Sequence, residues 1–355
     1  MQIYQGITDF PHLKHAVVTS GTFDGVHVGH QKILERLKTL AQLHQGQTVV
    51  ITFWPHPRLV LAQENQINNN PNNDQNNNQN KVLLLNTLEE KAALLAQNGV
   101  DYLVVLPFTQ EFSELSPDEF IQKIYIDAIQ TKHLIIGYDH HFGKNREGNF
   151  EFLQKNLEEN PAKYPFKIEE IPRQDIDNIG ISSTKIRKAL QNGNIKLANE
   201  YLGHYYQLSG KVVSGDKIGR TIGFPTANIL VEETYKIIPA DGIYAAFATL
   251  KSSENNQNNS ENNNQNATQK LQGMLYIGTR PSIRQSVAQE DKPTRRIELY
   301  IFDFDRDIYG EILTIFLVEK TREDAKFEGL EKLKVQLSQD MKDTKKVLSL
   351  SKFGY

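Results

Sequence analysis

The chain has 355 residues, which is enough for two domains with separate hydrophobic cores. Its 40 basic and 43 acidic side chains leave a formal net charge of −3, so the charge balance does not indicate nucleic acid as the main partner. The sequence contains no cysteine, which excludes a disulfide scaffold and cysteine-ligated zinc and fits a reducing cytosol. We find no signal peptide or membrane-spanning stretch, and therefore expect a cytoplasmic protein without a membrane partner.

The first half of the sequence, residues 1–190, alternates between strand and helix patterns. The expected strands are 15–20, 48–53, 101–106, 133–137 and 166–171. The expected helices are 31–44, 87–97 and 117–130. This alternation predicts a Rossmann-like parallel α/β sheet, in which ligands bind beyond the carboxyl ends of the strands.

The most informative motif is His-Val-Gly-His, which places His27 and His30 where the first expected strand passes into a helix. A helix N-terminus offers unpaired N–H groups and the positive end of the helix dipole, and both favour phosphate. The two imidazoles add hydrogen-bond donors without occupying much room. The motif therefore predicts an enzyme that acts on a nucleoside triphosphate.

Three further polar clusters follow expected strands or open an expected helix: 52–57, 136–148 and 181–187. In the last cluster, Ser182 or Ser183 can cap a helix that carries Lys185 and Arg187, and hydroxyls, cations and a helix end together form a phosphate site. Each cluster also has a structural explanation, because Ser-Ser-Thr is a common cap and a histidine between two prolines fits a rigid turn.

The adjacent pair His140 and His141 raises the question of a zinc site. Adjacent residues on a strand point to opposite faces, and the sequence offers no evident third ligand nearby. We therefore do not predict zinc at this pair.

After about residue 205 the helical periods give way to short apolar or β-branched runs. These runs are 206–213, 242–249, 271–277, 296–302 and 312–318. They predict an antiparallel barrel or sandwich over 206–355, joined to the first domain by a connector at 191–205. The tail 322–350 has the composition of one or two helices. Two Asn-rich tracts, 64–80 and 252–269, are expected to be disordered surface insertions, with an assembly-driving role as the alternative.

The second half carries its own candidate phosphate site in the glycine-rich run 215–228. Gly219 and Gly223 allow backbone to approach a phosphate closely, although a simple hairpin loop explains them as well. Thr226 and Asn228 supply the neutral oxygens that suit Mg²⁺ when phosphates bring the negative charge. Glu298, in a later strand, either faces solvent or serves as a general base beside ATP.

The motifs of the first half resemble the nucleotidyltransferase superfamily with the His-x-Gly-His signature. More narrowly, they are similar to the FMN adenylyltransferase half of prokaryotic bifunctional riboflavin kinase/FAD synthetases. The matching elements are Gly-x-Phe-Asp-Gly-Val-His-x-Gly-His-Gln, Thr-Phe-x-Pro-His-Pro, Gly-x-Asp-x-x-Phe-Gly-x-x-Arg-x-Gly and Ile-Ser-Ser-Thr-x-Ile-Arg. The resemblance implies that His27 and His30 contact the ATP phosphates in the transition state and that Asp139 lines the reacting centre. It implies further ATP contacts from Gly21, Phe23, Ser183, Thr184 and Arg187.

The chain departs from that pattern at two places. Many relatives have Phe-Arg at His140-His141, and some carry a basic residue at the position of Ile179 or Gly180. Phosphate binding is then expected to shift to another cation of the same motifs, namely Lys144, Arg146 or Lys185.

The second half resembles the riboflavin kinase domain, a small β-barrel with a C-terminal helix. The most specific match is Gly-Arg-Thr-Ile-Gly-Phe-Pro-Thr-Ala-Asn. The resemblance implies Glu298 as base on the ribityl 5′-hydroxyl, with Thr226 and Asn228 on Mg²⁺ and the ATP phosphates. It also implies flavin contacts from Lys326 and Phe327, at a C-terminal helix expected near 326–333.

The leading hypothesis is therefore an enzyme that makes FMN from riboflavin and ATP, and then FAD and pyrophosphate from FMN and a second ATP. One alternative is a nucleotidyltransferase for another small phosphate ester, although it would not need the second half. Another is a flavin-binding sensor or scaffold with inactive sites. A chain in which one half has lost its activity is the third. The sequence does not predict the oligomeric state.

Overall fold

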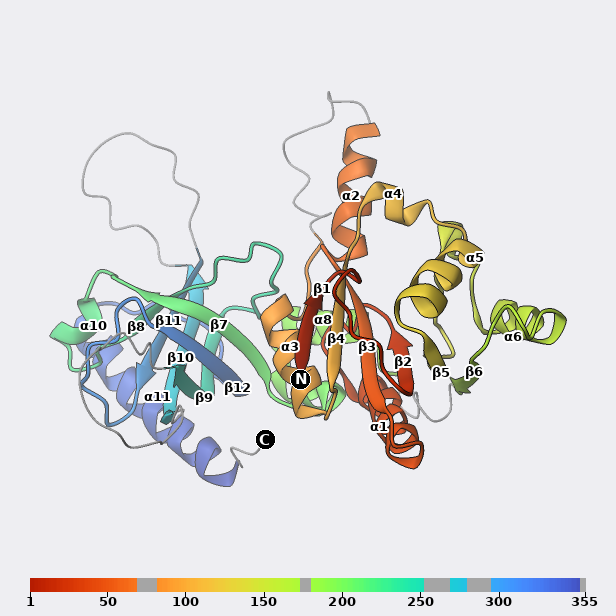
Figure 1. Cartoon of the computed structure of the whole chain (residues 1–355). Coiled ribbons are helices and arrows are strands. Elements are labelled where there is room, and N and C mark those ends of the chain that lie inside the picture. The colour runs from red at the N-terminus through yellow and green to blue at the C-terminus, as the bar shows by residue number, and fades with distance from the viewer. Residues whose placement is uncertain (69–81, 173–179, 252–268, 280–294, 352–355) are drawn as a thin grey trace, which may run out of the picture. The chain divides into compact units, whose positions relative to one another are not determined.

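The computed structural model describes residues 1–68, 82–172, 180–251, 269–279 and 295–351 (Figure 1). The chain divides into two compact units, Met1–Ser183 and Thr184–Tyr355, and each is described by itself. The division falls inside helix α8 (Ser183–Gln191), so the expected domain limits at 190 and 206 stay a prediction. None of the helices in the described ranges is long and apolar enough to cross a membrane.

The first unit contains a six-stranded parallel sheet, which confirms the fold class expected from the alternating pattern. In sheet order its strands are β1 (Gln2–Gln5), β4 (Tyr102–Pro107), β3 (Gln47–Trp54), β2 (Ala16–Ser20), β5 (Thr131–Gly137) and β6 (Lys167–Ile171). The sequence did not predict β1. It is a short edge strand with three exposed residues of four, so it lacks the apolar run by which the other strands were found.

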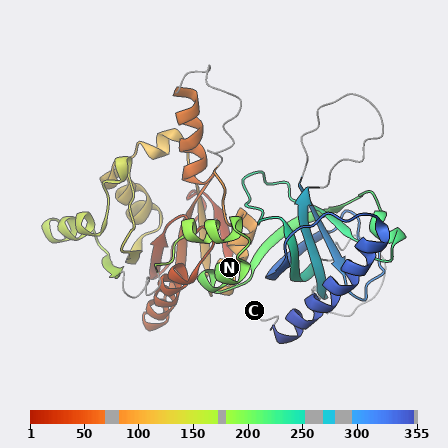
Figure 2. The same cartoon turned by 180° about the vertical axis from the view of Figure 1, so that it is seen from behind.

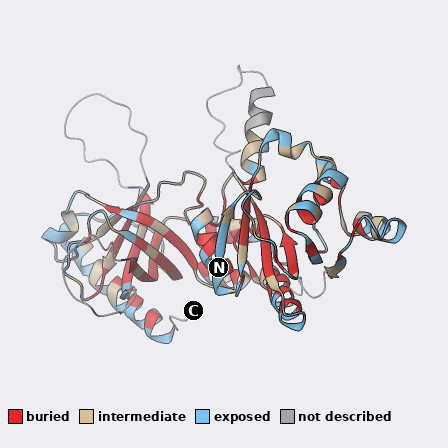
Figure 3. Cartoon of the chain, in the orientation of Figure 1, coloured by how far each residue is buried: buried red, intermediate tan, exposed pale blue. Residues whose placement is uncertain are grey.

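Helices cover both faces of the sheet because successive buried residues point to opposite sides. Val17 packs with α1 (Val28–Leu43) and α3 (Leu88–Gln97), whereas Val18 packs on the other side. That other side holds α5 (Pro117–Phe120), the π-helix η2 (Ile121–Ala128) and α6 (Phe150–Glu159). Figure 3 shows the central strands buried between these layers.

The strand order reverses beside β2. The chain passes from β2 to β3 and β4 on one side and then returns to β5 and β6 on the other. In open α/β sheets, such a reversal creates a crevice outside the carboxyl ends of the two adjacent strands. This rule places the expected crevice where β2 leads into the His-Val-Gly-His loop and β5 leads into Asp139 and His140.

The helix limits differ from the expected ones in informative ways. Helix α1 begins at Val28, three residues before the expected start. The prediction missed these residues because they do not show the apolar periodicity of a helix. Helix α2 (Pro57–Asn68) runs five residues into the first Asn-rich tract, so the tract is helical at its start. The rest of that tract, 69–80, lies outside the described residues, and so does 252–268 of the second tract.

The second unit contains a closed antiparallel barrel, which confirms the expected architecture (Figure 2). Around the barrel the strands are β10 (Gln269–Thr279), β11 (Arg295–Ile301), β8 (Ala227–Leu230), β7 (Tyr206–Val213), β12 (Ile312–Arg322) and β9 (Gly242–Lys251). The sequence did not predict β8, whose four residues directly follow the glycine-rich run. Before the barrel the chain also forms α9 (Ile195–Leu202), within the expected connector.

The C-terminal segment corrects one expectation. Strand β12 continues to Arg322 because it keeps pairing with β9, and helix α11 (Leu330–Leu350) starts only after Gly329. Lys326 and Phe327 therefore precede the helix instead of belonging to it. The charged composition of this stretch suggests a helix, but composition does not register cross-strand pairing.

Helix α11 covers one outer side of the barrel. Its Leu337, Met341 and Leu348 pack against residues of one face of β9, β10, β11 and β12. On β11, Tyr300 and Phe302 belong to this covered face, whereas Leu299, one position from Tyr300, points to the opposite side. Since side chains alternate along a strand, Glu298 shares the face of Tyr300.

Candidate active sites

In the first unit, the two histidines lie together at the start of α1. His27 is the residue before the helix, and its ring stacks on that of His30 with centroids 3.7 Å apart and planes 15° from parallel. The first turn of α1 carries no acidic side chain. The arrangement places two hydrogen-bonding rings at a helix end whose dipole attracts an anion, as the motif predicted.

The His30 ring is buried, and burial lowers its pKa well below the ordinary value, with further lowering by His27 and Lys91. It is therefore neutral at neutral pH. Its Nδ1 atom is buried and has no hydrogen-bond partner among the described residues. A buried ring nitrogen without a partner is costly in a finished protein, so this atom indicates a ligand that supplies the missing bond.

The loop before the histidines has a strained backbone. Phe23 and Val26 have positive φ angles of 46° and 41°, which are rare for side chains of this kind, and Gly25 lies between them at 92°. The Phe23 ring is buried 5.0 Å from that of His30, and a side chain at Gly21 would crowd it at 3.3 Å. The side chain of Phe23 thus supports His30, and only its backbone is left for contact with a nucleotide.

The loop is tied to the start of α8, which begins within the expected Ser-Ser-Thr motif. The Ser183 hydroxyl donates to the carbonyl oxygen of Asp24 over 2.9 Å. The Asp24 carboxylate in turn accepts from the Leu85 backbone N–H at 2.8 Å. The structure thus brings Ser183 to the histidine loop, while Thr184, which is exposed, and Arg187, which is half-buried, follow it along the same helix.

At the end of β5, Asp139 is exposed while His140 turns inward. The His140 Nε2 atom lies 3.3 Å from the Ser20 hydroxyl, which shares a 2.6 Å hydrogen bond with Tyr125. Burial lowers the pKa of His140 to about 4, helped by His141, so the ring is neutral at physiological pH. His140 thus joins the ends of β2 and β5 beside the crevice, and Asp139 is left as the polar group that faces outward there.

One charged residue near this site was missed by the sequence interpretation. Lys91 on α3 is 2% exposed, and its ammonium lies 3.3 Å from the Thr52 hydroxyl. Burial lowers its pKa to about 8, against the opposing effect of Asp24. The signal was available, because Lys91 stands three positions after Leu88 and four before Leu95, within the apolar stripe of the helix. A lysine is almost never fully buried unless it is paired, so its position on the apolar stripe was an available signal.

In the second unit, three of the predicted residues meet. Glu298 is 5% exposed, so the solvent-facing alternative was wrong. The Thr226 hydroxyl donates to Glu298 Oε2 at 3.1 Å. Asn228 is paired directly with Glu298 across β8 and β11, so the two side chains point to the same face. The cluster contains a carboxylate beside two neutral oxygen groups, which is the donor set expected for Mg²⁺ with phosphates.

The glycines around this cluster leave it room. A side chain at Gly219 would collide with the Phe224 carbonyl, and one at Gly215 would collide with the Asn228 amide. Gly223 has a φ of 86°, and a side chain placed there would meet no atom within 4 Å, so its backbone faces open space. Both glycines that were predicted to line the phosphate site therefore have a structural requirement for glycine.

The predicted flavin contacts lie in the segment between β12 and α11. Phe327 packs under the Arg322 guanidinium, whose central carbon is 5.6 Å from the ring centroid, and Arg322 forms a two-pronged ion pair with buried Asp340 of α11. The same segment reaches β10, the strand beside β11, because Asp324 accepts a 3.3 Å hydrogen bond from Tyr276. Lys326 is exposed. The segment is thus anchored at Phe327, with Lys326 projecting from it.

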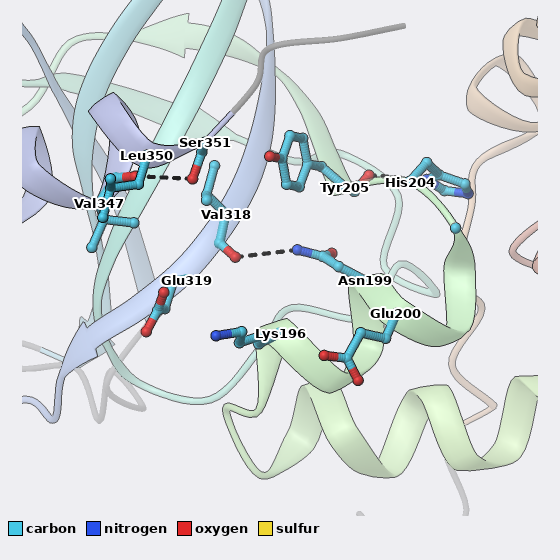
Figure 4. Close-up of a pocket in the computed structure, with 11 residues that line it drawn as sticks. Lys196, Asn199, Glu200, His204, Tyr205, Val318, Glu319, Val347, Leu350 and Ser351 are labelled. Carbon is cyan, nitrogen blue, oxygen red and sulfur yellow. Dashed lines mark hydrogen bonds between the residues drawn. The ribbon is translucent and has the colours of Figure 1, made fainter. Parts of the chain in front are cut away.

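A surface pocket of the second unit lies apart from this cluster (Figure 4). It lies between α9, β12 and the end of α11, and its lining mixes Lys196, Glu200 and Glu319 with apolar side chains such as Val347. None of the predicted site residues lines it. The pocket therefore does not bear on the two candidate sites.

Comparison with known proteins matches each half of the chain to a protein family. The FAD synthetase family model matches residues 9–185, and the riboflavin kinase model matches residues 202–348. A bifunctional riboflavin kinase/FMN adenylyltransferase from Listeria monocytogenes is 37% identical over 93% of this chain and 91% of its own. The protein of that name from Escherichia coli K12 is 32% identical over 95% and 94%.

A crystal structure described as a macrolide-efflux protein from Streptococcus pneumoniae superposes with a TM-score of 0.75 at 28% identity, covering 97% of this chain and 98% of that one. The same two-part fold thus extends over nearly the whole of both chains. With two matched family models, and with relatives that align over nearly their full length, the chain belongs to the family of bifunctional riboflavin kinase/FMN adenylyltransferases.

Proposed function

We propose that the second unit transfers the γ-phosphoryl group of ATP to riboflavin, and that the first unit transfers AMP from a second ATP to the resulting FMN. The observation that carries the proposal is the presence of a complete side-chain cluster in each unit. These are the stacked His27–His30 pair and the Thr226–Glu298–Asn228 group. A flavin sensor or scaffold would not need the buried, partnerless nitrogen of His30.

In the first unit, a phosphate oxygen of FMN attacks the α-phosphorus of ATP, and the bond to the pyrophosphate oxygen breaks. No proton is needed for this exchange, so catalysis rests on positioning and on stabilising charge on the phosphates. His30 enters the reaction neutral, because burial holds its pKa down. Bound triphosphate would raise that pKa, so the ring would take up a proton more readily and, as imidazolium, donate charge-assisted hydrogen bonds. Asp139, Ser183, Thr184 and Arg187 are proposed to complete the site, with Gly21 and Phe23 contributing backbone.

In the second unit, Glu298 accepts the proton of the ribityl 5′-hydroxyl as its oxygen attacks the γ-phosphorus, and ADP leaves. The Thr226 hydroxyl holds one carboxylate oxygen at 3.1 Å, which orients the other for the substrate. Lys326 and Phe327 are proposed to contact the flavin. The anchoring of Phe327 by Arg322 supports this, since a fixed ring offers a surface for stacking.

ATP-using enzymes of these families generally need a divalent metal, and we propose Mg²⁺. The donor set fits, because Thr226 and Asn228 bring neutral oxygens next to a carboxylate on one face of the barrel. Bound there with the ATP phosphates, Mg²⁺ would neutralise their negative charge. A cytoplasmic location likewise stays a prediction from the sequence.

Incubation of the purified chain with riboflavin and Mg-ATP tests the proposal, with the flavins separated by chromatography. We expect FMN to appear first and FAD to follow. Added FMN with ATP should give FAD without riboflavin. If only FMN formed, the adenylyl transfer assigned to the first unit would be wrong. If added FMN gave FAD but riboflavin stayed unphosphorylated, the assignment of the second unit would be wrong.

The position of Asn228 can be tested through Gly215. In Gly215→Ala the new methyl group collides with the Asn228 amide and displaces it. We expect the KM for Mg-ATP in riboflavin phosphorylation to rise by roughly tenfold, the effect of losing about one hydrogen bond or ligand. The rate of FAD formation from supplied FMN serves as the control and should not change.

Replacing Lys91 is expected to affect the stability of the protein and its adenylyl-transfer activity in opposite directions. Its pKa of about 8 lies below the unfolded value, so burying its charge costs roughly 3 kcal/mol at pH 7. The unfolded chain binds more protons between pH 8 and 10.5, so the stability due to this group rises with pH across that window. We expect Lys91→Met to fold at least as stably as the wild type at pH 7 and to lose this rise, although adenylyl transfer falls about tenfold.

The pH profile of kcat/KM for adenylyl transfer separates this role from a structural one. In the wild type, we expect a decline above about pH 8 as Lys91 loses its proton. In Lys91→Met that decline should be absent. An unchanged profile in the variant would show that the buried charge does not act on the nucleotide site. Exposed Lys123, also a helix lysine of this unit, gives the control Lys123→Met.

A further inference from the structure

Three histidines meet at the amino ends of the strands of the first unit, the end away from the proposed nucleotide site. His15 immediately precedes β2, His133 is the third residue of β5, and His44 is the residue that ends α1. The cluster therefore lies at the amino ends of the two strands whose carboxyl ends border the crevice. It is the one group of three potential metal-binding side chains found within the described ranges.

A local irregularity brings two of the rings together. The parallel pairing of β2 and β5 shifts register between Ala16 and Val17, so that Val17 pairs with His133 and Lys132 is the extra residue. Such bulges re-aim a side chain without ending the strand. As a result, His15 Nε2 and His133 Nδ1 are only 3.0 Å apart.

The third ring closes the group. The His44 ring centroid lies 4.7 Å from that of His15 and 4.6 Å from that of His133. One nitrogen from each of the three rings falls within 4.8 Å of the other two. In a tetrahedral site with metal–nitrogen bonds of about 2.1 Å, ligand nitrogens are separated by about 3.4 Å. The closest pair is already near this spacing, and His44, which is exposed, is free to swing inward.

We propose that His15, His44 and His133 bind one divalent transition-metal ion, with zinc as the ion of choice. Three imidazoles match the preference of Zn²⁺ for nitrogen and leave the fourth tetrahedral position for water. Mg²⁺, the metal proposed for ATP, prefers oxygen and is not expected to compete here. The contrasting interpretation is a metal-free stack in which His15 and His133 share a hydrogen bond.

The charges around the cluster bear on its strength. Burial is the largest cause that lowers the pKa of His15, followed by His44 and then by Lys132 and Lys167. Glu169 acts in the opposite sense on His133, but its carboxylate is already engaged by Arg36 at 2.6 Å. The pKa values of His15 and His133 are thus both lowered, chiefly by burial, which favours the neutral form that a metal ligand needs. The ion would be held by its bonds to the three ring nitrogens, because the surrounding charged side chains do not attract a cation.

Binding at this place would join three elements of the first unit. The ion would fix the end of α1 to the starts of β2 and β5, and the other end of α1 carries His30. Because an ion that binds only the folded chain stabilises it by mass action, zinc should raise the Tm of the protein.

The test uses the full chain, stripped of metal with a chelator and kept free of nucleotide. Zn²⁺ is titrated by calorimetry at pH 7.5 into the wild type, His44→Gln and the double variant His15→Gln/His133→Gln. We expect the wild type to bind one more equivalent than the double variant and His44→Gln to weaken that binding at least tenfold. His12→Gln, which changes an exposed histidine three residues from His15, is the control and should match the wild type. Comparing variants in this way separates the cluster from any zinc taken up by His27 and His30.

Cobalt provides a second readout that does not depend on activity. Co²⁺ bound by the wild type should give the intense visible absorption of a tetrahedral site, which His44→Gln should lose. Zinc should also raise the Tm of the wild type and of His12→Gln, but not that of His44→Gln. The proposal is overturned if His44→Gln binds zinc as the wild type does, if the cobalt spectrum is octahedral, or if the wild type takes up no zinc. Since His44 is exposed, its variant should fold, and its circular dichroism checks this.

Discussion

Replacing Glu298 by glutamine is expected to lower kcat for riboflavin phosphorylation by about two to four orders of magnitude, the usual contribution of a general base. The amide keeps the size of the side chain and can still accept the Thr226 hydrogen bond, but it cannot take the proton of the 5′-hydroxyl. The KM for riboflavin should change little, since glutamine keeps the size and position of the side chain. The measurement is the initial rate of FMN formation under saturating Mg-ATP.

The chain supplies its own controls for this experiment. FAD formation from supplied FMN depends on the first unit and should proceed at the wild-type rate in Glu298→Gln. Glu319→Gln makes the same chemical change on β12, at a residue that lines the separate pocket, and should leave both rates unchanged. Wild-type phosphorylation by Glu298→Gln would remove the base assignment. A higher KM with unchanged kcat would assign Glu298 to substrate positioning instead.

The sequence predicted those parts of the sites that are local in the chain. His27 and His30 stand at a strand-to-helix junction that periodicity alone reveals, and the structure places their stacked rings there. The order of strands and helices in the first half was likewise readable, because each buried strand is a continuous apolar run. Elements without such a run were missed, as with β1, in which three of the four residues are exposed.

What could not be predicted depends on contacts between distant segments. Thr226 and Glu298 are 72 positions apart, and only the pairing of β8 with β11 brings them into hydrogen-bond contact. The same holds for Ser183 and the Asp24 carbonyl, 159 positions apart. Residue type and motif had made Ser183, Thr226 and Glu298 candidates and the family resemblance specified their roles, but nothing in the sequence showed these contacts. The histidine cluster is the extreme case, because its three members share no motif and meet only through a register shift.

The two sites use charge in different ways. In the first unit the candidate phosphate-binding groups are imidazoles, of which His30 is buried and has a lowered pKa, and a buried cation of lowered pKa lies nearby at Lys91. In the second unit the central group is a carboxylate flanked by neutral oxygens. The difference follows from the chemistry. The phosphate nucleophile of FMN needs no proton removed, whereas the hydroxyl of riboflavin does.

For this reason His30→Ala is expected to act on stabilisation of charge in the transition state and not on proton transfer. Loss of a single preorganised donor lowers kcat by about two to three orders of magnitude, and we expect FAD formation to fall at least a hundredfold. Riboflavin phosphorylation by the same polypeptide should be unaffected, which controls for folding and for the quality of the ATP. The exposed His141 gives the matched variant His141→Ala, for which we expect adenylyl transfer close to the wild-type rate.

The ring of His30 also packs on Phe23, so its removal leaves a cavity that could disturb the loop by itself. His30→Gln distinguishes the two effects, because it fills much of the space and restores one donor. If charge stabilisation is the cause, the glutamine variant should regain part of the lost kcat with an unchanged KM for ATP. Equal losses in both variants would indicate that ring packing, and not hydrogen bonding to phosphate, is what the site requires. Wild-type turnover by His30→Ala would refute the assignment of the motif to catalysis.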